Sequence, residues 1–261
     1  MLSLSNEQLR VEIASRLQGD FNVLVFDELD STNSKLKSLA DDGASAGTIV
    51  IARRQTAGRG TQGRKFYSPL NGLYMSMLVK PNFAVAESAS LTVATAVAVV
   101  DAIKAVLKIK CGIKWVNDIF YQNKKVGGIL TEGEVATGTQ MLKSAVVGIG
   151  LNLATPEQAY PPAIRQVAGA LLTADKLPDC YCTLVAEIVN RAYRLLGKVD
   201  INNYLKKYQK YSILKGRKIQ LVKNGQAYTG KVQGIDAKAR LVVKLGKAVV
   251  KLSAGEVAIV Q

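Results

Sequence analysis

The chain of 261 residues contains no histidine. Because histidine is the commonest general base and the commonest metal ligand in proteins, hydrolases built on a Ser-His or Cys-His pair are excluded. A zinc site would have to come from the three cysteines, of which only Cys180 and Cys182 are close in sequence. Any reaction must therefore use lysine, arginine, carboxylates and backbone dipoles, a set that suits phosphoryl or nucleotidyl transfer.

Cysteines and long apolar runs are also few. An odd number of cysteines in a chain without a signal-like start predicts free thiols in a reducing compartment, so we expect a cytoplasmic protein. The longest apolar stretch, residues 91–107, is interrupted by Asp101 and Lys104 and is shorter than the roughly 20 apolar residues of a membrane span. We therefore expect no membrane segment.

Acidic residues are absent between Asp42 and Glu87, where six cations occur: Arg53, Arg54, Arg59, Arg64, Lys65 and Lys80. Three glycines, Gly58, Gly60 and Gly63, match the dinucleotide pattern G-x-G-x-x-G, but no helix is predicted directly after them, which disfavours a Rossmann site. Backbone N–H groups exposed by these glycines, together with the arginines, predict a loop that binds an anion. The alternative is a basic loop in solvent.

Periodicity predicts an α+β domain followed by a small all-β domain. Helical spacing occurs at residues 4–17, 30–43 and 84–107 and near 181–197 and 200–209, and strands are expected at 21–29, 47–53, 71–81 and through 111–153. Hairpin turns are predicted at Asn123-Lys124-Lys125 and at Asn224-Gly225. We expect a mixed sheet flanked by helices in residues 1–210 and a separate small barrel in residues 211–261.

The net charge of +15 is concentrated in the second of these domains. Residues 211–261 carry ten Lys or Arg against two acids, a surplus of +8. Basic surfaces contact nucleic acids, anionic membranes or acidic proteins, and composition alone does not choose among these partners.

Four segments in a fixed order carry the strongest functional signal. They are DSTNS at 30–34, QTAGRGTQGRKFYSP at 55–69, KWVNDIFYQNKKVGGILTE at 114–132 and GIGLNL at 148–153. Each alone has an ordinary structural explanation, because Asn-Asp pairs often form turns and glycines often permit close strand packing. Together they resemble the biotin protein ligases, which join biotin to a lysine of a carrier protein through biotinyl-5′-AMP.

The resemblance implies a fold and a site. The fold would be a catalytic domain like that of class II synthetases and of biotin and lipoate ligases, with a C-terminal SH3-like β-barrel. The residues that would bind biotin are Ser31, Thr32, Asn33, Gln55, Arg59, Gly60, Thr61, Lys125, Gly128, Leu130, Gly148 and Gly150. The residues that would bind the nucleotide are Arg59, Arg64, Trp115, Asn117, Lys125, Asn152 and Arg217.

The resemblance also implies the chemistry. Adenylation brings a carboxylate against the α-phosphorus of ATP, so Arg59, Lys125 and Mg²⁺ would neutralise two anions that repel each other. Asp118 is the nearest candidate to orient the carrier lysine or take its proton. Biotin and ATP with Mg²⁺ would be the substrates, a biotin carboxyl-carrier protein such as that of acetyl-CoA carboxylase would be the partner, and no protein-bound metal is expected. A homodimer is left open.

The chain departs from the family pattern at three positions. Thr61 stands where Arg is usual, Phe66 where Trp is common, and Val116 where Pro is usual. The last two are apolar replacements, but the missing arginine predicts weaker retention of biotinyl-AMP.

Two alternative functions remain. A lipoate ligase has a related fold and the same two-step chemistry, although the GRGTQGR loop and the pairing of KWVND with KKVGG favour biotin. A nucleic-acid-binding protein could use the basic C-terminal region. Only 30 residues precede Ser31, too few for the winged helix of family members that are also repressors, so we expect the enzyme-only class, which binds no DNA.

Overall fold

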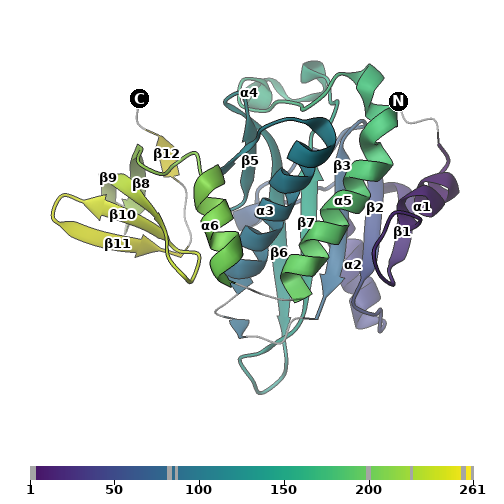
Figure 1. Ribbon diagram of the computed structural model, residues 1–261, viewed down its shortest axis with the longest axis horizontal. Coiled ribbons are helices and arrows are strands. Elements are labelled where there is room, and N and C mark those ends of the chain that lie inside the picture. Colours follow the sequence, from purple (N-terminus) through teal and green to yellow (C-terminus); the bar gives the residue numbers. More distant parts are fainter. Residues whose placement is uncertain are drawn as a thin grey trace.

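The computed structural model describes residues 4–80, 84–85, 88–197, 201–223, 226–253 and 257–259. The larger of its two sheets has seven strands (Figure 1). In spatial order these are β1 (Asn22–Leu29), β2 (Thr48–Gln55), β3 (Leu73–Val79), β7 (Leu142–Leu151), β6 (Lys124–Val135), β5 (Asp118–Tyr121) and β4 (Gly112–Lys114). β1 and β2 run parallel and the other neighbours are antiparallel.

Helices cover both faces of this sheet. On one face lie α3 (Ser88–Leu107), α5 (Leu177–Gly197) and α6 (Ile201–Tyr211), with α1 (Asn6–Ala14) beside β1; α2 (Thr32–Asp41) lies on the other face (Figure 1). Short helical segments were not predicted: α4 (Pro162–Arg165) and single 3-10 turns at Thr61–Gly63, Glu157–Ala159 and Ala174–Lys176. They are too short to show a helical period in the sequence.

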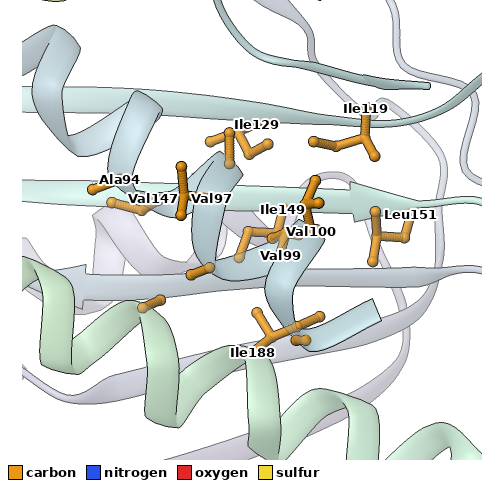
Figure 2. Close-up of a cluster of buried hydrophobic side chains, with 14 of the residues drawn as sticks. Ala94, Val97, Val99, Val100, Ile119, Ile129, Val147, Ile149, Leu151 and Ile188 are labelled. Atoms are coloured by element: carbon orange, nitrogen blue, oxygen red, sulfur yellow. The ribbon is translucent and has the colours of Figure 1, made fainter. Parts of the chain in front are cut away.

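The main core lies between the sheet and α3. Ala94, Val97 and Val100 of α3 are buried against Ile129 of β6 and Ile149 of β7, and α5 closes the cluster from outside (Figure 2). By length and composition α3 could cross a membrane, but 67% of its most apolar 18-residue window is buried inside the protein, as in a core helix.

Strand alternation sends the next set of side chains to the α2 face. Val146 of β7 joins Leu36 of α2, Val50 of β2 and Leu78 of β3 in a second, smaller apolar cluster. Gly148 and Gly150 are in phase with Val146, because successive strand residues point to opposite faces. Beyond this second cluster, therefore, β7 presents backbone without side chains.

Two helices begin at side-chain caps, and one hairpin turns one residue earlier than predicted. Ser5 and Gln8 form the capping box of α1, and the Ser31 side chain caps α2 by accepting from the Ser34 N–H. The hairpin predicted between β5 and β6 is confirmed, but its turn falls at Gln122-Asn123, with φ of 47° and 61°, one residue before the predicted Asn123-Lys124-Lys125. Lys125 is a strand residue with a fixed direction.

The smaller sheet contains strands in the order β11 (Ala248–Leu252), β10 (Leu241–Leu245), β9 (Gln226–Ile235), β8 (Lys218–Lys223) and β12 (Val257–Ile259). All of its pairs are antiparallel. The predicted fold class, a mixed sheet with flanking helices plus a small C-terminal β domain, is confirmed. The turn predicted at Asn224-Gly225 lies outside the described residues, and the boundary at residue 210 stays a prediction.

Candidate active site

A cleft with a cavity volume of about 120 Å³ opens on the α2 face of the large sheet, where β7 is bare. All twelve residues predicted to bind biotin line it, although they come from four separate segments of the chain. The other lining residues are Arg64, Lys65, Phe66, Asn117, Ile129 and Ile149. The fold thus brings the four sequence motifs together, while their roles as ligands stay predictions.

The glycine-rich loop is a compact hairpin along one wall. The Gly60 N–H donates to the Arg64 carbonyl at 2.7 Å, and the Phe66 N–H donates to the Gly58 carbonyl at 2.8 Å. A Cβ on Gly58 would lie 2.4 Å from the Phe66 carbonyl oxygen, so this close approach requires glycine. The Phe66 ring lies over Gly150, where an added Cβ would come within 2.6 Å of it. In this state the loop is therefore held against the sheet.

The floor at the start of α2 is polar and buried. Ser31, Thr32 and Asn33 are each less than 5% exposed because they pack on the bare part of the sheet. The Thr32 N–H donates to Gln55 Oε1 at 2.8 Å, and Gln55 Nε2 donates to Ser68 Oγ at 2.8 Å. Such a floor offers both donors and acceptors to a ligand.

Both predicted catalytic cations are paired with a carboxylate. Lys125 Nζ lies 2.6 Å from Asp118 Oδ1, and Arg59 Nη2 lies 2.7 Å from Glu132 Oε2. The Lys125 and Arg59 side chains are 36% and 40% exposed, so a ligand in the cleft can reach them. With Arg64 and Lys65 they give the cleft a positive lining, which favours an anionic ligand.

Asn117 and Asn152 are fixed by the backbone around them. Asn117 Nδ2 donates to the Ile129 carbonyl at 2.9 Å, and Asn152 Nδ2 donates to the Gly169 carbonyl at 3.0 Å. Asn152 is buried, and within the described part of the chain its Oδ1 has no hydrogen-bond partner.

Besides Asn152, three residues predicted to belong to the site do not line the cleft: Trp115, Arg217 and Asp118. Trp115 is buried, and its indole N–H donates to the Ala239 carbonyl of the small domain at 3.0 Å. Arg217 lies in a different groove, with Lys110 and Lys215. Asp118 forms the ion pair with Lys125 described above. Within the described ranges, no group of three or more Cys, Asp or Glu side chains could hold a metal ion.

Glu132 is the site residue that sequence reasoning missed. It accepts hydrogen bonds from Asn33 Nδ2 at 2.7 Å and Lys37 Nζ at 2.6 Å, and also pairs with Arg59. Partial burial would raise its pKa, but the hydrogen bonds from Lys37 and Asn33 and the nearby Arg59 charge lower the pKa below its ordinary value. Strand alternation is the signal that could have found it, because Gly128, Leu130 and Glu132 share one face of β6.

Two family profiles match the chain. One, described as the biotin/lipoate A/B protein ligase family, covers residues 25–152, and the other, described as the biotin protein ligase C terminal domain, covers residues 216–260. The first contains every residue that lines the cleft, and the second covers most of the smaller sheet. Together with the fold, these matches define the class of biotin and lipoate protein ligases.

Several of the similar proteins are named as biotin ligases. The chain is 29% identical to the bifunctional ligase/repressor BirA of Bacillus subtilis (97% of this chain, 78% of the relative) and 28% identical to the biotin–[acetyl-CoA-carboxylase] ligase of Mycobacterium tuberculosis (97% and 95%). The biotin protein ligase of Aquifex aeolicus, solved with biotin and ATP, superposes with a TM-score of 0.74 at 26% identity over 92% of this chain and 99% of that one. The chain belongs to the biotin protein ligase family.

Proposed function

We propose that the protein activates biotin with ATP as biotinyl-5′-AMP and transfers the biotinyl group to a lysine of a biotin carrier protein. One observation carries the proposal: a single cleft places a buried polar floor next to four cations, Arg59, Arg64, Lys65 and Lys125. A polar head group and an anionic tail can bind there side by side. The relatives named above support biotin as the acid.

The polar floor suits the head group of biotin. Its cyclic urea has one carbonyl acceptor and two N–H donors, and it needs matching groups when it leaves water. Ser31, Thr32 and Gln55 supply hydroxyl and amide groups, while Leu130 and Phe66 supply apolar contacts for the sulfur ring and the alkyl chain. Asn33 faces the same floor, but its Nδ2 already donates to Leu130 and Glu132.

In the first step, a carboxylate oxygen of biotin attacks the α-phosphorus of ATP, and the bond to the pyrophosphate group breaks. The two reacting groups are both negative, so nearby cations lower the barrier. At about 4 Å and an effective dielectric near 20, one opposite charge contributes about 4 kcal/mol before desolvation is counted. Lys125 and Arg59 would supply such charges, and the carboxylates that pair with them offset part of this gain.

Asn117 and Asn152 are proposed to bind the nucleotide. Asn117 lines the cleft, whereas Asn152 is buried outside its lining and would contribute by fixing the backbone at Gly169. Trp115 would contribute indirectly, because its bond to Ala239 ties the segment before Asn117 to the small domain. Arg217 would reach the nucleotide only from its separate groove.

In the second step, the neutral amine of the carrier lysine attacks the acyl carbon, AMP leaves, and the amine loses a proton. Asp118 is the carboxylate proposed to orient the amine and accept this proton. Its ion pair with Lys125 lies at the cleft, so a change in the charge around Lys125 would free it for this role.

We predict that Asp118→Asn slows transfer from preformed biotinyl-AMP at least about tenfold, because an amide cannot accept the proton. Single-turnover transfer to a purified carrier measures this step without the first one. Asp27→Asn, on the edge strand β1 and with a side chain that is 82% exposed, is the matched control and should transfer at the parent rate. Transfer at full rate by Asp118→Asn would remove the role.

The acceptor is proposed to be a biotin carboxyl-carrier protein, with neither DNA nor a membrane as a partner. The buried free thiols of Cys111 and Cys182 support a reducing, cytoplasmic setting.

The function is tested by measuring pyrophosphate release from ATP and Mg²⁺ with biotin, with lipoate and with no acid, followed by mass analysis of the nucleotide product. Biotin-dependent release and a biotinyl-AMP peak are expected. Pyrophosphate release with lipoate but not with biotin would indicate a lipoate ligase of the same fold. If neither acid caused pyrophosphate release, the proposal would be contradicted, and nucleic-acid binding by the basic C-terminal domain would be the alternative to test.

A further inference from the structure

We propose that Glu132 is a positioning residue, which sets the direction of hydrogen bonding across the polar floor through Asn33 and holds the glycine-rich loop through Arg59. Its effect on the reaction rests on the proposed function, whereas its effect on the loop does not.

Glu132 joins three parts of the cleft. The carboxylate sits on β6, and its partners are Asn33 and Lys37 of α2 and Arg59 of the loop, all at 2.6–2.7 Å. Its side chain is 21% exposed, so these contacts are shielded from solvent more than an ordinary surface ion pair is. One anion thus connects the sheet, the helix and the loop.

The direction of the floor follows from counting hydrogens. Asn33 Nδ2 donates to Glu132 Oε2 at 2.7 Å and to the Leu130 carbonyl at 3.3 Å. These two bonds use both hydrogens of the amide. A reversed amide would place its oxygen against the carboxylate, which the negative charge disfavours. Asn33 Oδ1 therefore faces Ser76 Oγ, 2.6 Å away and fully buried.

Ser76, Thr32 and Gln55 are the next groups in the hydrogen-bond network of the polar floor. Ser76 has one hydroxyl hydrogen, and it must point to Asn33 Oδ1, because two bare acceptors at that distance would repel. The Thr32 hydroxyl lies 2.8 Å from Ser76 Oγ and 3.1 Å from Gln55 Oε1, so its single hydrogen has two acceptors within reach. Gln55 Oε1 accepts the Thr32 N–H, and Gln55 Nε2 donates to Ser68 Oγ. A negative Glu132 thus sets the direction of hydrogen bonding from Asn33 to Ser76, while the Thr32 N–H sets that of Gln55.

The loop depends on the same carboxylate. The hydrogen bonds of Gly58 to Phe66 and of Gly60 to Arg64 are internal to the hairpin and do not join its tip to the sheet. Phe66 packs on Gly150 at its base, and the Arg59–Glu132 pair provides the link nearer the tip. Removing the charge of Glu132 should loosen residues 57–66.

The test compares Glu132→Gln with Glu134→Gln, a matched change two residues further along β6, where Glu134 pairs with Lys143 outside the cleft. In ligand-free protein, amide hydrogen exchange of residues 57–66 should be several-fold faster in Glu132→Gln and unchanged in Glu134→Gln. In the adenylation assay, KM for biotin should rise about tenfold (about 1.4 kcal/mol) while KM for ATP and kcat stay within about threefold. Glu132→Asp, which keeps the charge, should recover part of both effects.

Unchanged exchange together with an unchanged KM for biotin in Glu132→Gln would overturn the proposal. An equal loss of kcat/KM for biotin and for ATP, not relieved by Glu132→Asp, would also overturn it, since that pattern indicates general damage. If Glu132→Gln does not fold, Glu132→Asp should show the same two changes at smaller size, because its shorter side chain cannot reach all of its partners at once. No difference between Glu132→Asp and Glu134→Asp would then overturn the proposal. The exchange measurement needs no substrate, so it distinguishes failure of this inference from failure of the proposed function.

Discussion

At the scale of single residues, the glycines of the large sheet decide whether the cleft exists. A Cβ on Gly148 would lie 2.1 Å from Asn33 Oδ1, whereas a Cβ on Gly128 of the neighbouring strand would meet its nearest atom at 3.6 Å. Both face the same cleft, but only the first has no room for a methyl group.

We therefore predict that Gly148→Ala lowers the free energy of unfolding by about 1–3 kcal/mol, because Asn33 is held on several sides and cannot move aside. Gly128→Ala should change it by less than about 1 kcal/mol. Urea unfolding followed by circular dichroism measures both. Equal losses for the two variants would contradict the packing argument.

The lowered pKa of Glu132 predicts how stability depends on pH. Its folded pKa lies below the ordinary value of about 4.3 in an unfolded chain, so its contribution is present above that pH and is lost as pH falls through the folded pKa. The stability difference between the parent and Glu132→Gln should therefore shrink as pH is lowered from about 6 to about 3. Urea unfolding at several pH values tests this, and a difference that stays constant would show that the charge is not responsible.

Residue identity alone predicted the cleft well but not the contacts within it. The Ser-Thr-Asn segment, Gln55 and Lys125 could be found from motifs, because short backbone segments carry them. The partners Asp118 and Glu132 were not foreseen as ion-pair partners, since pairing across strands depends on register, which the sequence does not display.

At the scale of elements, the glycine-rich loop shows what Thr61 does in place of a cation. Its hydroxyl accepts from Arg64 Nη2 at 3.2 Å, so it orients a neighbouring cation and adds no charge of its own. Compared with the arginine that the family resemblance implies at this position, Thr61 leaves the loop with one positive charge fewer to hold an adenylate.

We predict that Thr61→Arg slows the release of biotinyl-AMP about tenfold, since a charge-assisted hydrogen bond to the phosphate contributes about 1.5–3 kcal/mol. Rapid dilution of preformed enzyme-bound adenylate, followed by quantification of free biotinyl-AMP, measures the rate. Thr61→Ser keeps the contact to Arg64 and should release it at the parent rate. If the arginine variant released as much as the parent, the substitution at this position would not explain retention.

Elements with a strong local signal were predicted, and those set by a few backbone angles were not. The caps at Ser5 and Ser31 follow from side chains that compete for free N–H groups. The turn at Gln122-Asn123 needs two residues with positive φ, and the sequence has no glycine there. The predicted turn was therefore placed one residue too late, at Asn123-Lys124-Lys125.

At the scale of the whole molecule, the class of fold could be predicted from the change of period along the chain. The relation between the two sheets could not, because it depends on single contacts such as that of Gln209 Nε2 with the Ile235 carbonyl at 3.2 Å. This explains why Trp115 and Arg217, both expected to bind the nucleotide, do not line the cleft: their positions depend on how the small domain sits.

The bond between Trp115 and Ala239 has an experimental consequence. Trp115 is the only tryptophan in the chain, and its indole is buried where the large sheet meets the small one. The protein therefore carries its own fluorescent reporter at the junction of its two parts, without labelling. A red shift of its emission that comes before the loss of helical circular dichroism would show the small domain detaching first, and coincident transitions would show that the two parts unfold as one unit.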